Sequence, residues 1–296
     1  MKRILILMHE YQRSRAQNYL IDALAKVWQS WGLEVTYAFG VKERTAADLL
    51  IPHIDLTQTP PEYIEFIQSY PAATNRTVFD ISKRSFGANL LRGDEEYCGP
   101  VIVKTNCNGS GVPEHRLFQY HHPLLAGLRR KGVPLAERLL GRRFAWQTML
   151  RGYPIYNSLA EVPAGVFKNP ALVVERFLPE NEGERYFMRH YLFLGDHCRS
   201  VRVEGLGPFL KRASCKLVDE GLEVPAPVLE LRQRLGMDYG KIDYVVHEGQ
   251  AVILDVNRTV GVPGGPELTA RTVADLVEGI CSLLPGGRAE GEGPNS

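Results

Sequence analysis

The sequence predicts an α/β fold that starts with a parallel sheet and ends with an antiparallel, α+β part. Ile4 to Met8 is an uninterrupted apolar run, which is typical of a strand buried on both faces. Residues 16–31 carry apolar side chains at helical spacing, and residues 33–39 then alternate between apolar and polar. A strand, a helix and a second strand in this order form a β-α-β unit, and such units build parallel sheets.

Prolines and glycines divide the rest of the chain. Four prolines between residues 41 and 80 break this stretch into short pieces, so we expect the first lobe, residues 1–80, to end there. The elements predicted after it are a helix over 83–92, strands over 101–104, 171–178, 186–194 and 197–203, a helix over 225–235, and a final hairpin. Residues 286–296 are mostly glycine and polar, which predicts a disordered tail.

Composition and charge exclude several classes of protein. Lys and Arg total 35 against 34 Asp and Glu, so the formal net charge of +1 gives no general attraction to nucleic acid. The apolar run after the N-terminus stops at His9, too early for a signal peptide, and no other segment has the length of a membrane helix. Five scattered cysteines without a C-x-x-C pair indicate a reducing compartment and no zinc site. We therefore expect a cytoplasmic protein without nucleic-acid or membrane partners.

A lysine and a glycine-rich loop follow one predicted strand in an arrangement that suits phosphate. Lys104 ends the strand, and the loop over 106–111 contains Gly109, Ser110 and Gly111. Glycines let backbone N–H groups approach phosphate oxygens, and the lysine supplies a positive charge. The lysine precedes the glycines, so the segment is not a Walker A loop. Taken alone, it fits a surface turn after a solvated lysine equally well.

The strand over 171–178 has features that suit the rest of a nucleotide. It ends with Glu175, Arg176, Phe177 and Leu178, and the acidic residues Glu180, Glu182 and Glu184 follow. An extended segment offers backbone groups to an adenine edge, and a nearby carboxylate can accept hydrogen bonds from ribose hydroxyls. An ordinary core strand with a solvated acidic turn explains the same pattern, and it is favoured for this segment by itself.

Polar side chains interrupt the apolar strands of the final hairpin. Asp243 lies in the first strand, and Asp255 and Asn257 are two residues apart in the second, so these two share a face. Two carboxylates and an amide oxygen are ligands that suit Mg²⁺. An unpaired carboxylate among apolar neighbours would be costly, so a magnesium site is favoured over residues that merely flank turns.

The strand pairing predicts the length of the hairpin loop. Asp243 and Asp255 can share one magnesium ion if they are directly opposed. A two-residue turn at 248–249 would oppose Asp243 to Leu254, and a slip of one residue turns every side chain to the other face. We therefore predict a three-residue loop, 248–250. The pairs that follow are Asp243 with Asp255, Lys241 with Asn257, Ile242 with Val256, Tyr244 with Leu254, and Val246 with Val252.

The order of these motifs resembles the ATP-grasp superfamily, of the type of D-alanyl-D-alanine ligase and glutathione synthetase. The resemblance rests on G-P-V-I-V-K with its glycine loop, V-V-E-R-F-L, and K-I-D-Y with L-D-V-N-R-T-V-G, and it covers roughly residues 80–285. It implies a Rossmann-like lobe, residues 1–80, before a two-lobed ATP-grasp domain, residues 81–285. Residues 97–180 of this domain would contain the nucleotide lid, and its antiparallel sheet would carry the metal site.

The resemblance also implies roles for individual residues. The expected nucleotide contacts are Lys83, Lys104, Gly109, Ser110 and Gly111 at the phosphates, Glu175, Phe177 and Leu178 at adenine, and Glu182 or Glu184 at the ribose. Asp243, Asp255 and Asn257 resemble the metal ligands. Arg202 and Lys241 are the catalytic candidates, and Arg202 would steady the transferred phosphoryl group, although a surface strand residue explains it equally well. Lys241 stands where Arg is frequent, and Asp255 where Glu is common, so the number of metal ions stays open.

The implied activity is that of an ATP-dependent ligase. A carboxylate of a small molecule or peptide would attack the γ-phosphate of ATP, with Mg²⁺ or Mn²⁺, and an amine or similar nucleophile would open the acyl phosphate. The protein would position the reactants and neutralise charge, so no Ser, Cys or His is assigned a catalytic role. A phosphotransferase and a non-catalytic ATP-binding regulator are the alternatives, and a homodimer is left open beside a monomer.

Overall fold

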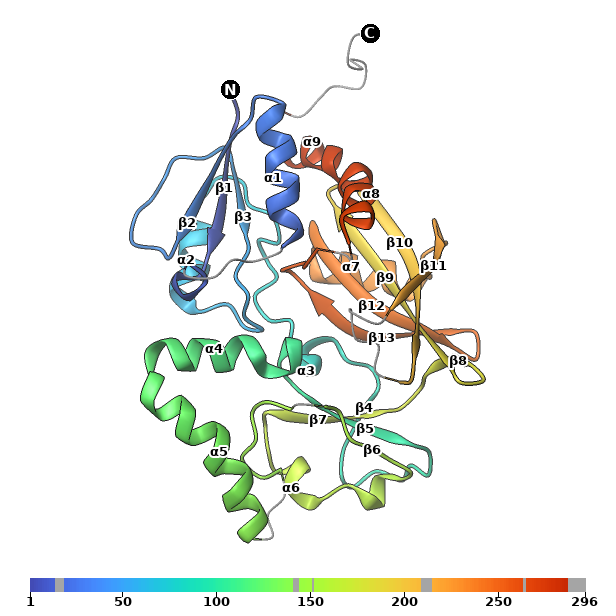
Figure 1. Cartoon of the computed structure of the whole chain (residues 1–296). Coiled ribbons are helices and arrows are strands. Elements are labelled where there is room, and N and C mark those ends of the chain that lie inside the picture. The colour runs from blue at the N-terminus through green and yellow to red at the C-terminus, as the bar shows by residue number, and fades with distance from the viewer. Residues whose placement is uncertain (14–18, 141–143, 151, 209–214, 263–264, 287–296) are drawn as a thin grey trace.

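A computed structural model describes residues 1–13, 19–140, 144–150, 152–208, 215–262 and 265–286. In these residues the chain forms three sheets that follow one another along the sequence (Figure 1). Most of the predicted tail, residues 287–296, lies outside the described part. In the described part, no helix is both long and apolar enough to cross a membrane.

The first sheet is parallel and has the order β2-β1-β3, from the strands β1 (Arg3–Met8), β2 (Glu34–Phe39) and β3 (Leu49–Pro52). The helix α1 (Leu20–Ser30) joins β1 to β2, so the predicted β-α-β unit is present. Ile4 and Ile6 pack in the cluster that contains α1, whereas Leu5 and Leu7 pack in the cluster that contains α2 (Pro61–Gln68). Because both faces of β1 are covered, its sequence is apolar without interruption.

The second sheet is antiparallel and has the order β4-β7-β5-β6, from β4 (Leu90–Leu91), β5 (Val101–Thr105), β6 (Ile155–Tyr156) and β7 (Leu172–Arg176). The helices near it are α4 (Val112–His121), α5 (Pro123–Leu139) and α6 (Ala164–Phe167). The helix predicted over 83–92 is wrong beyond its first turn, since α3 covers only Lys83–Phe86. At Gly87 the backbone turns extended so close to the Lys83 carbonyl that a Cβ would lie 2.5 Å from that oxygen. Gly87 therefore ends α3, although the helix predicted from the sequence continues to residue 92.

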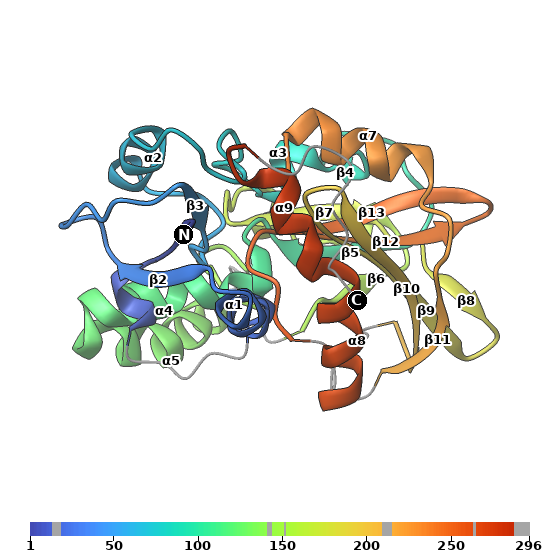
Figure 2. The same cartoon turned by 90° about the horizontal axis from the view of Figure 1, so that it is seen from above.

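The third sheet is antiparallel and has the order β11-β10-β9-β12-β13, with β8 paired to β9. Its strands are β8 (Glu180–Glu182), β9 (Arg185–Leu194), β10 (His197–Leu206), β11 (Lys216–Glu220), β12 (Tyr239–His247) and β13 (Gln250–Asn257). The helix α7 (Ala226–Leu235) covers one face, where it packs on Tyr191, Ile242 and Tyr244. The helix α8 (Pro266–Leu276), the short helix η5 (Val277–Gly279) and α9 (Ile280–Leu283) lie on the other face (Figure 2).

The hairpin of β12 and β13 has the predicted pairing at the carboxylates but a different loop and a different register near the turn. Asp243 is opposed to Asp255, Lys241 to Asn257 and Ile242 to Val256, as predicted. The three-residue loop is wrong, because His247 pairs with Gln250 and leaves a two-residue turn at Glu248–Gly249. The predicted pairs of Tyr244 with Leu254 and Val246 with Val252 are wrong as well, since Tyr244 pairs with Ile253 and Val246 with Ala251.

A β-bulge at Leu254 reconciles the short turn with the opposed carboxylates. Glu248 and Gly249 both have positive φ, 49° and 79°, as favoured two-residue hairpin turns require. The register shifts between the pairs at Asp243 and Tyr244, so Leu254 is the extra residue of β13. The bulge takes up the one-residue slip that the turn introduces, and both carboxylates therefore return to opposed positions.

Candidate nucleotide and metal site

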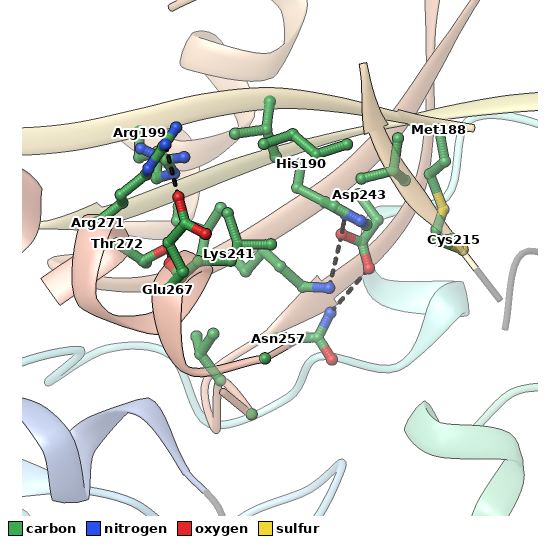
Figure 3. A pocket seen from close by; sticks show the side chains of 18 of the residues that line it. Met188, His190, Arg199, Cys215, Lys241, Asp243, Asn257, Glu267, Arg271 and Thr272 are labelled. Atoms are coloured by element: carbon green, nitrogen blue, oxygen red, sulfur yellow. Dashed lines mark hydrogen bonds and ion pairs between the residues drawn. The ribbon is translucent and has the colours of Figure 1, made fainter. Parts of the chain in front are cut away.

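The side chain of Asp243 is held by three neighbours at the surface of the third sheet (Figure 3). Its Oδ1 lies 2.6 Å from His190 Nδ1 and 2.9 Å from Lys241 Nζ, and Asn257 Nδ2 donates to Oδ2 at 3.4 Å. Burial raises the pKa of this carboxyl, but the charges of Lys241 and His190 lower it more, so the net pKa is well below its usual range. Asp243 is therefore ionised and fixed in orientation.

Asp255 is the second buried carboxylate of this site, and its environment differs. Lys83 Nζ donates to Asp255 Oδ1 at 3.3 Å. Burial and the negative charge of Asp243 raise the pKa of the Asp255 carboxyl, while Lys83 and Lys104 lower it only in part. Because the charge of Asp243 raises the pKa of the opposed Asp255, a cation between the two carboxylates would be stabilising. With the amide oxygen of Asn257, this all-oxygen donor set fits Mg²⁺.

Two buried lysines bring carboxylates from two sheets together. Lys83, at the start of α3, is only 3% exposed. Burial lowers the pKa of its ammonium, but Asp255, Tyr153 and Glu175 raise it more, so the group stays charged. Lys104 of β5 donates to Glu175 of β7 at 2.7 Å, and both side chains are buried. Lys104 also lowers the pKa of Asp255, and Glu175 raises the pKa of Lys83. The two ion pairs therefore lie within one electrostatic cluster.

The glycine-rich loop contacts the metal site. Gly109, Ser110 and Gly111 all have positive φ, and a Cβ on Gly111 would lie 2.3 Å from the Thr148 carbonyl oxygen. Asn108 Nδ2 donates to Asn257 Oδ1 at 2.8 Å and to the Val256 carbonyl at 3.2 Å. The sequence predicted this loop beside a phosphate, and the structure brings it to the candidate metal ligands.

The predicted adenine residues lie at the end of β7 and directly after it, and the predicted ribose residues follow them. Phe177 and Leu178 are half-buried, and the backbone N–H of Phe177 donates to the Pro100 carbonyl at 2.9 Å. Glu182 of β8 is exposed and pairs with Arg185 and Arg202, at 3.0 Å each. Glu184, the alternative ribose acceptor, is also exposed.

Arg202 lies apart from the predicted metal ligands, although it contacts the predicted ribose residue Glu182. On β10 it pairs in register with Arg189, whereas Val201 pairs with His190, which is opposed to Asp243. Alternation along the strands puts Arg202 on the face opposite Asp243. There Arg202 contacts Glu180 at 2.9 Å, Glu182 at 3.0 Å and Asp219 at 3.5 Å. The phosphoryl role predicted for Arg202 therefore has no geometric support.

A pocket of about 760 Å³ opens beside the carboxylates, between the third sheet and the start of α8. Lys241, Asp243, His190 and Asn257 line it together, between Arg199 and Arg271 on one side and Met188 on the other (Figure 3). This volume is typical of a site for a small molecule or the end of a peptide.

Comparison with known proteins identifies the fold. No protein-family model matches the chain, and no curated protein matches its sequence. Among solved structures, an ATP-grasp ligase, PsnB, complexed with a minimal precursor shares 12% identity at a TM-score of 0.51, covering 96% of this chain and 98% of that chain. A RimK domain ATP-grasp protein from Sphaerobacter thermophilus shares 11% identity at a TM-score of 0.50, covering 96% of this chain and all of that chain. The chain has the ATP-grasp fold.

The ATP-grasp fold is the fold that the resemblance in the sequence implied, while the roles of single residues rest on the geometry above. Two residues of the site were not identified from sequence. His190 is opposed to Asp243 on β9, and Asn108 reaches Asn257 from the glycine loop. The alternation of β9 would place His190 on a defined face, but only the pairing of β9 with β12 reveals which residue it meets.

Proposed function

We propose that this protein is an ATP-dependent ligase that activates a carboxylate as an acyl phosphate and transfers the acyl group to an amine or similar nucleophile. The observation that carries the proposal is the cluster in which Lys83 donates to Asp255, Lys104 donates to the neighbouring Glu175, and Asp255 is opposed to Asp243. Cations for phosphate and oxygen ligands for a metal are the groups that phosphoryl transfer requires.

The nucleotide is assigned to the cluster at the second sheet. Lys104 and Lys83 would neutralise phosphate oxygens, with the loop Gly109, Ser110 and Gly111 over them. Adenine would lie at Glu175, Phe177 and Leu178. An exposed carboxylate, Glu182 or Glu184, would accept hydrogen bonds from the ribose.

Asp243, Asp255 and Asn257 would hold Mg²⁺, or Mn²⁺ in its place. When bound, the metal would neutralise charge on the phosphate oxygens. Lys241 contacts Asp243 at 2.9 Å and lines the pocket, so its ammonium is available to the oxygens of the transferred phosphoryl group. His190 holds Asp243 from the neighbouring strand and keeps its carboxylate in one orientation.

The chemistry has two steps. A substrate carboxylate oxygen attacks the γ-phosphorus of ATP, the bond to the bridging oxygen breaks, and ADP leaves with that electron pair. An amine nitrogen then attacks the acyl carbon, inorganic phosphate leaves, and the nitrogen loses a proton to solvent. These residues position both partners and stabilise the charge that develops on the phosphoryl oxygens.

The similarity to PsnB supports a peptide as well as a small molecule as the substrate. That protein is described as an ATP-grasp ligase complexed with a minimal precursor. We accordingly include peptides among the candidate carboxylates and amines.

The test is a screen for ADP release over amino acids, short peptides and small carboxylates with candidate amines, followed by mass analysis of products. We expect ADP and free phosphate in equal amounts, with formation of the phosphate dependent on the amine. A phosphorylated product without amine dependence would identify a phosphotransferase, and no ADP from any mixture would contradict an enzyme. Asp255→Asn should abolish turnover, whereas Asp219→Asn, which changes a carboxylate on the opposite side of the sheet at Arg202, should retain it.

A further inference from the structure

The pocket beside the carboxylates runs across the strands of the third sheet rather than along them. In one row, Asn257 of β13 pairs with Lys241 of β12, Lys241 with Leu192 of β9, and Leu192 with Arg199 of β10. Neighbouring strands lie about 4.8 Å apart, so Leu192 is about 5 Å and Arg199 about 10 Å from the Lys241 position. A ligand whose carboxylate lies at Lys241 therefore meets an apolar side chain before it meets the next charge.

On the sheet side of the pocket, Leu192 separates Lys241 from Arg199, and Val201 lies diagonal to Leu192 on the same face. Leu268 of α8 also lines the pocket, and Met188, Val203 and Leu217 form a further apolar row beyond His190 and Asp243. These side chains offer no hydrogen-bond partners, so a polar or charged group bound between them would lose its hydration without compensation. An apolar group would instead gain about 25 cal/mol for each Å² that it buries.

The outer end of the pocket does not favour a second carboxylate. Arg199 contacts Asp275 and Glu220, the latter at 2.7 Å. Arg271 contacts Glu220 at 3.2 Å and Glu267 at 2.8 Å. Three carboxylates thus surround two guanidinium groups, and an incoming carboxylate would have to displace one of them.

We infer that the activated carboxylate belongs to an apolar amino acid of about leucine or phenylalanine size, or to a short peptide that ends in one. This inference rests on the proposed ligase function and names its substrate class. The apolar side chain lies over Leu192 and Val201, and Leu268 covers it from α8. The span of about 10 Å to Arg199 admits about three extended residues.

Binding is tested apart from turnover. Calorimetry with magnesium and a non-hydrolysable ATP analogue compares tripeptides that differ only in the last residue, Leu, Ala or Glu. We expect the Leu peptide to bind at least tenfold more tightly than the Ala peptide, as contacts of this size usually discriminate, and more tightly still than the Glu peptide. Equal affinities, or a preference for Glu, would overturn the inference. Loss of ADP formation with intact Leu preference would instead refute the ligase function alone.

Two matched variants locate the binding in the pocket. Leu217→Trp fills the pocket from β11 and should weaken the Leu peptide tenfold or more without changing nucleotide affinity. Val218→Trp makes the adjacent change on β11, at a side chain that is 39% exposed and is not among the residues that line the pocket, and should leave both affinities unchanged. Equal effects of the two variants would refute the pocket as the site. If Leu217→Trp does not fold, Val203→Ala tests the same point. It enlarges the pocket, so the affinity for a peptide that ends in Phe should rise relative to one that ends in Leu, and an unchanged ratio would refute the pocket as the site.

Discussion

The two faces of the third sheet carry similar residues and differ in what those residues meet. On the face covered by α7, Arg202 is surrounded by Glu180, Glu182 and Asp219, and Arg189 also binds Glu180. On the pocket face, Asp243 and Asp255 are opposed, and Asp243 lines an open cavity. Ionic groups on the first face are neutralised within the sheet itself.

The difference shows that a charged residue in an apolar strand is not by itself a sign of function. Arg202 and Lys241 were equal candidates in the sequence, since each is a cation within a strand. Their faces separate them, because side chains alternate along a strand and the pairing decides which side reaches the pocket.

The largest expected effect separates these two cations. Lys241→Gln should lower kcat by about 10² to 10³, the usual loss when one group that stabilises transition-state charge is removed. Arg202→Gln should change kcat less than about threefold, because Arg202 lies on the face opposite Asp243. Steady-state kinetics of both variants with the best substrate checks this. A larger loss in Arg202→Gln than in Lys241→Gln would mean that the reaction takes place on the face covered by α7, and would contradict the assigned site.

The next effect concerns the cluster of Lys83, Lys104 and Glu175, to which we assign the nucleotide. Lys104→Ala should weaken ATP binding by about 1 to 3 kcal/mol, the contribution of a charged hydrogen bond. Calorimetry on the folded variant measures it, with Lys216→Ala on the exposed strand β11 as the control. Unchanged affinity in Lys104→Ala would remove β5 and its loop from the site.

A third effect concerns His53 of the first lobe, whose ring lies 4.4 Å from that of Tyr19 and 6.3 Å from that of Tyr239. The His53 imidazole is fully buried, and neither ring nitrogen has a hydrogen-bond partner among the described residues. Burial lowers its pKa to about 3. Below about pH 6.5 His53 is protonated in the unfolded chain but stays neutral in the folded chain. The free energy of unfolding therefore falls as the pH is lowered from 6.5 toward 3.

Between pH 7 and pH 5 this group should therefore lower the free energy of unfolding by about 2 kcal/mol, at 1.36 kcal/mol for each pH unit below 6.5. Denaturant unfolding at several pH values measures the slope. His53→Phe should flatten the slope by that amount whatever its stability at pH 7. The same slope in both proteins would mean that His53 is protonated or solvated in the folded state.

The smallest effect concerns the turn that precedes the bulge. Gly249→Val should lower the free energy of unfolding by about 1 kcal/mol, because a β-branched residue is strained at positive φ. Glu248→Asn should raise it by less than about 1 kcal/mol, because Asn adopts this conformation more readily. Neither should change nucleotide affinity, since the bulge at Leu254 lies between the turn and the carboxylates. A change in affinity would show that the turn, rather than the bulge, sets the register.

Local patterns in the sequence predicted the parts of the molecule that local physics decides. The run Ile4 to Met8, the helix that Gly236 ends with positive φ, and the strands β9 and β10 all follow from apolar spacing and glycine positions. The opposition of Asp243 and Asp255 was also predictable, because their charges require a common partner.

The remaining features depend on contacts between distant segments. The bulge at Leu254 is an added residue that no spacing rule reveals, so the loop length was predicted incorrectly. His190 meets Asp243 only through the pairing of β9 with β12, and Lys83 meets Asp255 across 172 residues of chain. The face of Arg202 depends likewise on the pairing partners of its strand.

The core that joins the first and third sheets has a consequence for how the chain is made. Trp28 of α1 donates to the Val277 carbonyl, 249 residues later, and Ile4 and Leu20 share a cluster with Leu192 and Ile280. At ribosomal rates of about 5 to 20 residues per second, the first strand emerges on the order of tens of seconds before the helices that complete its cluster. During synthesis this apolar surface is open to aggregation, so the nascent chain should depend on a chaperone until its last helices emerge.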